Sequence, residues 1–173
     1  MPVSGPWEQL HAIGPAAALF AGAGVVLTSD LVDRRAPTRM LTLVALAVAF
    51  SYALWHQLSG NADATLEAFE GAVVLDNFAL YVAFLIISIT AVVTIVAAEF
   101  TDSITQRGEF HGLLLVSAGA MLLLAQSNDL IAIFIALETT SISQFVLAGI
   151  GRDDRSSEAG LKYLVLSAIS SAV

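Results

Sequence analysis

The sequence predicts an all-α membrane protein whose helices cross the bilayer several times. Composition is the first reason: 57% of the 173 residues are hydrophobic and 13% are charged, and the mean hydropathy is +0.82. A soluble domain carries about 25% charged residues. The second reason is the order of the residues, because the apolar ones gather into long segments and the arginines gather between alternate segments. We treat residues 1–173 as a single membrane domain.

Five apolar segments approach the roughly 20 residues that a helix needs to cross a membrane. Backbone groups that face lipid must be hydrogen-bonded within their own segment, so a helix is expected for each of them. In chain order, the predicted spans cover residues 12–32, 40–58, 78–98, 110–126 and 130–150.

A sixth apolar run starts near Ala159 and reaches the last residue, Val173, after about 15 residues, which is short of a full span. We therefore expect the sequence to be the N-terminal portion of a longer protein, with five full spans and a truncated sixth.

The basic residues predict how the spans are oriented. The loops after the second and fourth spans, residues 59–77 and 127–129, contain neither Lys nor Arg. Because Lys and Arg accumulate in cytoplasmic loops, we expect the other loops to be cytoplasmic and the N-terminus to lie outside. Trp7, Tyr52 and Trp55 would then lie near the outer surface, where aromatic side chains are common. The loops after the first, third and fifth spans contain all the arginines: Arg34, Arg35, Arg39, Arg107, Arg152 and Arg155.

Charge and motif content exclude several kinds of function. The net charge of −8 argues against binding to nucleic acid. The chain has no cysteine, so it cannot hold an iron–sulfur cluster or a disulfide by itself. No residues have the spacing of metal ligands, and the paired glycines of the first span do not follow a strand as a nucleotide-binding loop would. We expect no metal and no cofactor in this chain. The acidic outer loop, residues 59–76, is expected to contain a short helix at the membrane surface.

One carboxylate falls well inside a predicted span. Glu138 lies about eight residues from the start of the fifth span, which places it roughly 12 Å below the outer surface at a rise of 1.5 Å per residue. A charge at that depth costs about 3 kcal/mol on insertion scales, and such residues usually face a bundle interior or a water path. Glu138 is therefore a candidate for holding a proton. The alternative is that it only joins helices through hydrogen bonds.

Polar side chains near Glu138 are candidates for holding a chain of water molecules. Ser141 lies one helical turn from Glu138 on the same face. The full set is Thr139, Thr140, Ser141, Ser143 and Gln144. Taken singly, hydroxyl groups in a span are more often packing residues.

The start of the sixth segment carries Lys162, the only lysine. Ser156 is the expected N-cap of this helix, and Glu158 precedes Lys162 by four residues, a spacing that favours an ion pair. Lys162 is either an interfacial residue paired with Glu158 or a proton-relay partner for an acid on a neighbouring helix. A stripe of serines follows at helical spacing, and we expect it to allow close helix packing: Ser167, Ser170 and Ser171.

The stretch from Glu109 to Ala172 carries a specific combination of motifs. An acid and an aromatic residue open a span, and a small-residue helix with a methionine follows. Next come an S-N-D-L turn, L-E within a helix, an R-D-D-R loop and E-A-G-L-K-Y. In this combination the chain resembles subunit N of the proton-pumping NADH:quinone oxidoreductase, respiratory complex I. The stretch VLDNFALY, residues 74–81, is similar to the family's strand-like entry into its third span.

The resemblance implies an antiporter-like fold built around inverted repeats. In this family a glutamate on the fifth span is paired with a lysine on the seventh. Carried over to this chain, the glutamate is Glu138, the lysine of the sixth segment is Lys162, and Glu109 matches an acid at the start of the fourth span. The lysine of the seventh span would lie beyond Val173, so we expect this chain to hold only part of a proton path.

The resemblance also implies a function. The chain would belong to a non-redox subunit that translocates protons, while NAD, FMN, iron–sulfur clusters and quinone bind in other subunits. Its partners would be other membrane-arm subunits, including another antiporter-like subunit, in the inner membrane of a bacterium. Two alternatives stay open: a subunit of a multi-subunit cation/proton antiporter, and a structural scaffold of the membrane arm. The implied proton-carrying residues are Glu138 and Lys162, supported by Glu109, Thr140, Ser141 and Gln144.

Overall fold

The computed structural model describes residues 11–34, 36–59 and 66–171. The expectations for Trp7, Arg35 and Val173, and for part of the 59–76 loop, lie outside the described residues.

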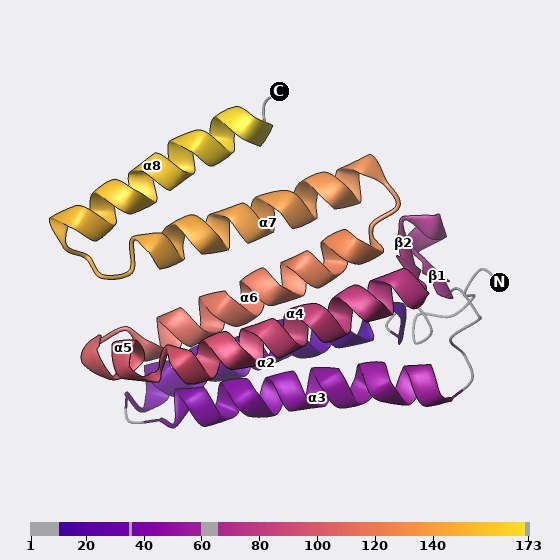
Figure 1. Ribbon diagram of the computed structural model, residues 1–173, viewed down its shortest axis with the longest axis horizontal. Coiled ribbons are helices and arrows are strands. Elements are labelled where there is room, and N and C mark those ends of the chain that lie inside the picture. Colours follow the sequence, from indigo (N-terminus) through magenta and orange to yellow (C-terminus); the bar gives the residue numbers. More distant parts are fainter. Residues whose placement is uncertain (1–10, 35, 60–65, 172–173) are drawn as a thin grey trace.

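Six long helices lie side by side and alternate in direction (Figure 1). Five of them, α2 to α4, α6 and α7, are long and apolar enough to cross a membrane, so the prediction of an all-α multi-pass membrane protein is confirmed. A short helix, α5 (Ala98–Ser103), lies between α4 and α6. The long helices are α2 (Gly14–Val32), α3 (Thr38–Leu58), α4 (Asn77–Val96), α6 (Arg107–Gln126), α7 (Leu130–Ala148) and α8 (Asp154–Ser171).

Two helices begin earlier than hydrophobicity predicted, because their first turns are polar. Helix α6 starts at Arg107 instead of near residue 110, and α8 starts at Asp154 instead of near residue 159. In α8 the carboxylate of Asp153 accepts from the backbone N–H of Ser156 at 2.8 Å, and the Ser156 hydroxyl accepts from the Asp153 N–H at 3.0 Å. Asp153, and not Ser156, is therefore the N-cap. Hydrogen bonds from the Ser156 hydroxyl and N–H hold the pKa of Asp153 below its ordinary value.

The outer loop contains a β-hairpin and not the predicted surface helix. Strands β1 (Leu66–Ala68) and β2 (Val73–Leu75) pair antiparallel across a 3₁₀ turn at Phe69–Gly71. The three turn residues have positive φ angles between 52° and 87°, a backbone that cannot continue as a right-handed helix. The hairpin also contacts the α6–α7 connection, where the Asn128 N–H donates to the Ala72 carbonyl at 2.9 Å.

Helix α6 lies in the middle of the bundle, packed against α2, α4 and α7. Small residues let the helices approach closely, as is usual in membranes. A Cβ added to Gly22 of α2 would lie 2.4 Å from the Cβ of Ala45 on α3 and 3.7 Å from a methyl group of Leu115 on α6. One added to Gly112 of α6 would lie 2.6 Å from Leu27 of α2. The core therefore depends on glycine and alanine at the helix contacts as much as on leucine.

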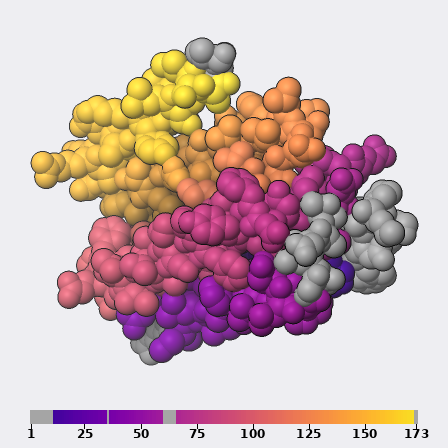
Figure 2. Space-filling model, turned by 45° about the vertical axis from the view of Figure 1, so that its right-hand side comes forward, coloured from indigo at the N-terminus to yellow at the C-terminus, as the bar shows by residue number. Residues whose placement is uncertain are grey.

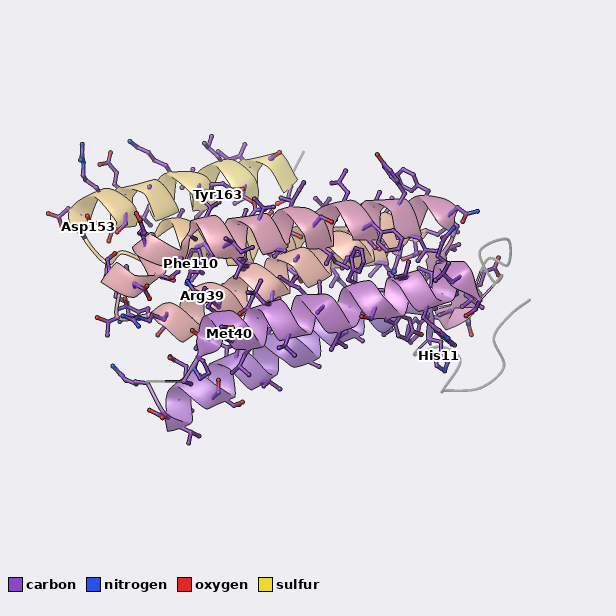
Figure 3. All side chains as sticks on the ribbon, turned by 60° about the horizontal axis from the view of Figure 1, so that its bottom comes forward. His11, Arg39, Met40, Phe110, Asp153 and Tyr163 are labelled. Atoms are coloured by element: carbon purple, nitrogen blue, oxygen red, sulfur yellow. The ribbon has the colours of Figure 1, made fainter. Side chains whose placement is uncertain are left out.

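The two ends of the bundle differ in charge. The connections α2–α3, α5–α6 and α7–α8 meet at one end, which we call the basic end, and the hairpin marks the other, the hairpin end. Arg39 and Asp153 lie toward the basic end, and His11 lies at the hairpin end (Figure 3). Within the described ranges, the basic end carries every Lys and Arg: Arg34, Arg39, Arg107, Arg152, Arg155 and Lys162.

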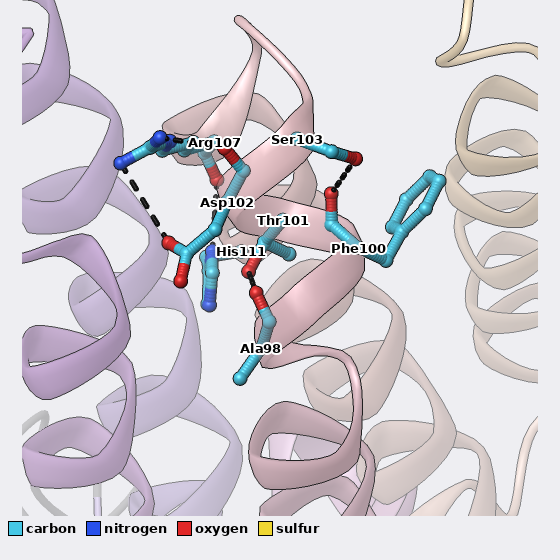
Figure 4. A network of polar contacts seen from close by, with 7 residues as sticks. All are labelled: Ala98, Phe100, Thr101, Asp102, Ser103, Arg107 and His111. Atoms are coloured by element: carbon cyan, nitrogen blue, oxygen red, sulfur yellow. Dashed lines mark hydrogen bonds and ion pairs between the residues drawn. The ribbon is translucent and has the colours of Figure 1, made fainter.

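The α5–α6 corner at the basic end is held by polar contacts (Figure 4). The Arg107 guanidinium donates to the Asp102 carbonyl at 2.8 Å and lies 3.7 Å from its carboxylate. The Nδ1 of His111 is hydrogen-bonded to the Arg107 carbonyl at 2.8 Å. These contacts fix where α6 enters the bundle.

Candidate functional site

An open pocket of about 410 Å³ lies between α7 and α8. These two helices form one side of the molecule, at the top of Figure 2 in orange and yellow. The polar side chains that line the pocket come from both helices: Glu138 and Ser141 from α7, and Tyr163, Ser167, Ser170 and Ser171 from α8.

Helix α7 carries Glu138 into this pocket from a capped start. The Asp129 carboxylate accepts from the backbone N–H groups of Ile131 at 2.8 Å and Ala132 at 3.3 Å, which satisfies donors that the first turn leaves free. Glu138 follows nine residues later, which is roughly 13 Å along the helix from the hairpin end. The carboxyl group therefore lies well inside the apolar length of the bundle.

Glu138 is half-buried, and one of its carboxyl oxygens is enclosed. This oxygen, Oε1, has no hydrogen-bond partner among the described residues. Leaving a buried polar atom unpaired costs about 1–3 kcal/mol, and more when the group is charged. The enclosed oxygen therefore lacks the partner that a buried polar atom normally has.

The hydroxyl groups near Glu138 fall into two sets. The Thr140 hydroxyl donates to the Ala136 carbonyl of its own helix at 2.9 Å, so its proton is not available to the pocket. Ser141 lines the pocket beside Glu138. The serine stripe of α8 also lines the pocket, and its role in close helix packing stays a prediction.

Gln144 and Tyr163 join the two helices on the basic side of Glu138. The Tyr163 hydroxyl donates to the Gln144 side-chain carbonyl. Sequence reasoning selected Gln144 and missed Tyr163. The spacing of Tyr163, Ser167 and Ser170 could have identified Tyr163, because it puts the three residues on one face of a helix.

Lys162 does not reach the pocket. Its ammonium lies 2.6 Å from a carboxylate oxygen of Glu158, and its side chain is 70% exposed, so the predicted ion pair is confirmed. The hydrogen bond between Gln144 and Tyr163 shows which residues of the two antiparallel helices lie at the same height along the bundle. Glu138 is six residues from Gln144, roughly 9 Å further toward the hairpin end, whereas Lys162 lies on the other side of that contact.

Glu109 also lies away from the pocket, in the first turn of α6. Its carboxylate is 3.1 Å from the guanidinium of Arg152, in the α7–α8 connection. Arg152 has a φ of 54°, which gives this loop its sharp turn. The ion pair joins the start of α6 to the α7–α8 corner at the basic end.

The closest approach of α7 and α8 is at two glycines. Gly160 is the one buried residue in the described part of α8. A Cβ added to it would lie 3.2 Å from the Cα of Gly149 and 3.2 Å from the Phe145 carbonyl oxygen. The helices are therefore in backbone contact near the basic end, and the pocket opens on the hairpin side of this contact.

Across the described ranges, no group of three or more His, Asp or Glu side chains is placed to hold a metal ion. The one carboxylate among the residues that line the pocket is that of Glu138.

Known proteins are similar to this chain along most of its length. Residues 127–173 match the family described as NADH:quinone oxidoreductase/Mrp antiporter, transmembrane, and this range includes the whole lining of the pocket. NADH-quinone oxidoreductase subunit N 1 of Rhizobium meliloti is 38% identical over 162 residues, which cover 92% of this chain and 33% of that protein. NADH-quinone oxidoreductase subunit N of Methylobacterium nodulans is 34% identical over 169 residues, covering 95% and 35%.

A cyanobacterial protein is similar over the whole chain. NAD(P)H-quinone oxidoreductase subunit 2 of Synechococcus is 34% identical over 183 aligned positions, which cover 100% of this chain and 34% of that protein. The chain spans about a third of the length of these curated relatives.

Proposed function

Because the chain belongs to the NADH:quinone oxidoreductase/Mrp antiporter family of membrane proteins, we propose that it is part of a subunit N of NADH:quinone oxidoreductase. In this proposal the subunit moves protons across the membrane, while other subunits carry electrons from NADH to quinone. NAD, FMN, iron–sulfur clusters and quinone bind in those subunits. The partners are the other membrane-arm subunits, including a second antiporter-like subunit.

The enclosed oxygen of Glu138 is the observation that carries this proposal. A carboxyl group with an unpaired buried oxygen is most stable when it holds a proton or faces a cation. The pocket around it is open on one side and lined by serine hydroxyls, which both donate and accept hydrogen bonds. Water in such a pocket links Glu138 to its surroundings, and this is what a proton-carrying group requires.

The other proposed residues act away from the carboxyl group. Ser141 holds water beside Glu138, and Gln144 with Tyr163 closes the pocket on the basic side. Thr140 supports the same turn of α7 through its bond to the helix backbone. Lys162 and Glu109 hold the charges at the basic end through their partners Glu158 and Arg152.

We place the basic end in the cytoplasm of a bacterium and the N-terminus outside. The distribution of Lys and Arg supports this orientation, because every one of them in the described residues lies at that end.

The test uses the complete subunit that contains this chain, in the assembled complex. Glu138→Gln keeps the size of the side chain and removes its ability to hold and release a proton. We expect NADH-driven acidification of inverted membrane vesicles to fall several-fold, with the complex still assembled. Glu99→Gln is the matched control, because Glu99 is exposed on α5 and its loss changes the net charge equally. Unchanged proton pumping in Glu138→Gln would overturn the proposal.

The family description favours one second candidate, since it also covers Mrp antiporters. In that case the chain is part of a cation/proton antiporter that uses the same pocket. Sodium-driven proton movement in vesicles without NADH would identify the antiporter, and strict dependence on NADH would identify the oxidoreductase. A structural scaffold predicts a third result, in which Glu138→Gln leaves both activities intact.

A further inference from the structure

A second set of buried polar groups lies at the hairpin end, outside the Glu138 pocket. His56 of α3 is 3% exposed and Gln126 of α6 is 2% exposed. Both ring nitrogens of His56 and both amide atoms of Gln126 lack a hydrogen-bond partner in the part of the chain that the structure describes. Buried polar atoms in proteins are nearly always hydrogen-bonded, so four such atoms require an explanation.

The register of α3 and α6 brings these two side chains to the same level. The two helices are in contact and run in the same direction (Figure 1). Gly22 fixes one common level, because it faces both Ala45 of α3 and Leu115 of α6. His56 and Gln126 each follow eleven residues after their reference residue. Eleven residues are close to three full turns and roughly 16 Å of rise, so both side chains stay on the sides of their helices that face α2.

We infer that His56 and Gln126 enclose a buried water site at the hairpin end of the bundle. A neutral imidazole offers one donor and one acceptor, and the amide offers two donors and an acceptor. A direct bond between the side chains would pair one atom of each and leave the other two unsatisfied. Bridging water pairs all of them, since an internal water makes two to four hydrogen bonds.

Electrostatics at the site also favour a neutral ligand. Among the described residues, the side chain with an electrostatic effect on His56 is that of His11, which is not an acid. Within the described ranges, no group of three or more His, Asp or Glu side chains at this site is placed to hold a metal ion. His11 is exposed and its Nδ1 is hydrogen-bonded at 2.8 Å to the hydroxyl of Tyr52, one turn before His56. This pair gives water a polar approach from the outer surface.

Hydroxyl-radical footprinting of the assembled complex by X-ray pulses tests the inference, because radicals formed from a bound water label the side chains beside it. Leu122 lies one turn before Gln126, Leu115 lies two turns before Leu122, and both are fully buried. We expect Leu122 to be oxidised several-fold faster than Leu115. In the variant His56→Leu with Gln126→Leu, oxidation of Leu122 should fall to the rate of Leu115.

Equal, slow oxidation of Leu122 and Leu115 in the wild-type complex would overturn the inference, and this comparison needs no variant to fold. Fast oxidation of Leu122 that persists in the double variant would overturn it as well, because the water would not depend on these two side chains. Neither result bears on Glu138, so the proposed function is tested separately.

Discussion

At the scale of single residues, Glu138 differs from the acids Glu109 and Glu158 in having no basic partner among the described residues. Glu109 has Arg152 as its partner and Glu158 has Lys162, both at the basic end. Glu138 has no such partner in the described residues, and Lys162, the alternative relay partner that the sequence offered, is paired with Glu158. A cation that approaches Glu138 must therefore come from outside the described helices, or Lys162 must first leave Glu158.

A substitution at Tyr163 tests the hydrogen bond that closes the Glu138 pocket toward the basic end. Tyr163→Phe removes the hydroxyl that donates to Gln144 and keeps the ring. We expect a loss of about 1 kcal/mol in the free energy of unfolding, the usual size of one hydrogen bond, measured in detergent on the purified subunit. Tyr81→Phe is the control, because Tyr81 is 66% exposed on α4. Equal effects of the two changes would show that the Tyr163–Gln144 bond does not contribute.

At the scale of elements, helix α8 depends on one narrow contact. It packs mainly against α7, and Gly160 is the residue that this contact buries. Close packing through small residues is how helices associate in a membrane, where burial of apolar side chains gives no advantage over lipid. The position of the serine stripe, and so one wall of the Glu138 pocket, follows from the approach of Gly160 to Gly149.

Gly160→Ala should push the two helices apart, because the new Cβ lies 3.2 Å from backbone atoms of α7 that cannot rotate away. We expect a loss of about 1–3 kcal/mol in the free energy of unfolding, as for other overpacked contacts. The control is Gly24→Ala on α2, where no atom lies within 4 Å of the new Cβ. That change should be neutral or stabilising by up to about 1 kcal/mol, since alanine favours helix more than glycine. A harmless Gly160→Ala would mean that α7 and α8 do not need backbone contact.

The sequence was sufficient for the long elements, because a membrane span requires an apolar length that is visible residue by residue. It also singled out Glu138, since a lone carboxylate in such a span needs no structure to be noticed. The residue pattern did not predict the hairpin, because strands of three residues show too little alternation to distinguish them from a loop. Only the family resemblance of residues 74–81 indicated a strand, and β2 (Val73–Leu75) overlaps that stretch.

The remaining errors concern contacts between helices. Sequence spacing put Lys162 and Ser167 on α8, but the level of α8 against α7 is set by Gly160 and by the Tyr163–Gln144 bond. That level decides which side chains face Glu138. This alignment depends on how the surfaces of α7 and α8 pack together, so it cannot be predicted from the residue pattern of one segment.

At the scale of the whole molecule, the two ends are chemically distinct. The basic end has arginines in or next to three connections, together with acids such as Asp102 and Glu109. The described hairpin end has no Lys or Arg and carries the acids Glu67, Glu70, Asp76 and Asp129. A membrane protein inserts with its basic loops on the cytoplasmic side, so this asymmetry predicts the orientation of the entire bundle.

Single cysteines test this orientation without background from the chain, because it has no cysteine of its own. We expect Glu67→Cys, on β1, to react with a membrane-impermeant maleimide added to intact cells. Asp154→Cys, at the start of α8, should react only after the cells are opened. As a control, both cysteines should react once the cells are opened, which shows that neighbouring subunits do not cover either position. The reverse pattern in intact cells would place the basic end outside.

The central claim is that Glu138 holds a proton inside the membrane, and infrared difference spectroscopy of the assembled complex tests it most directly. We predict that NADH addition changes a carbonyl-stretch band of a protonated carboxyl group, that the band shifts in heavy water, and that Glu138→Gln removes it. Glu99→Gln should leave it in place. A spectrum in which wild type and Glu138→Gln show the same carboxyl bands would contradict the claim, because Glu138 would then neither gain nor lose a proton during turnover.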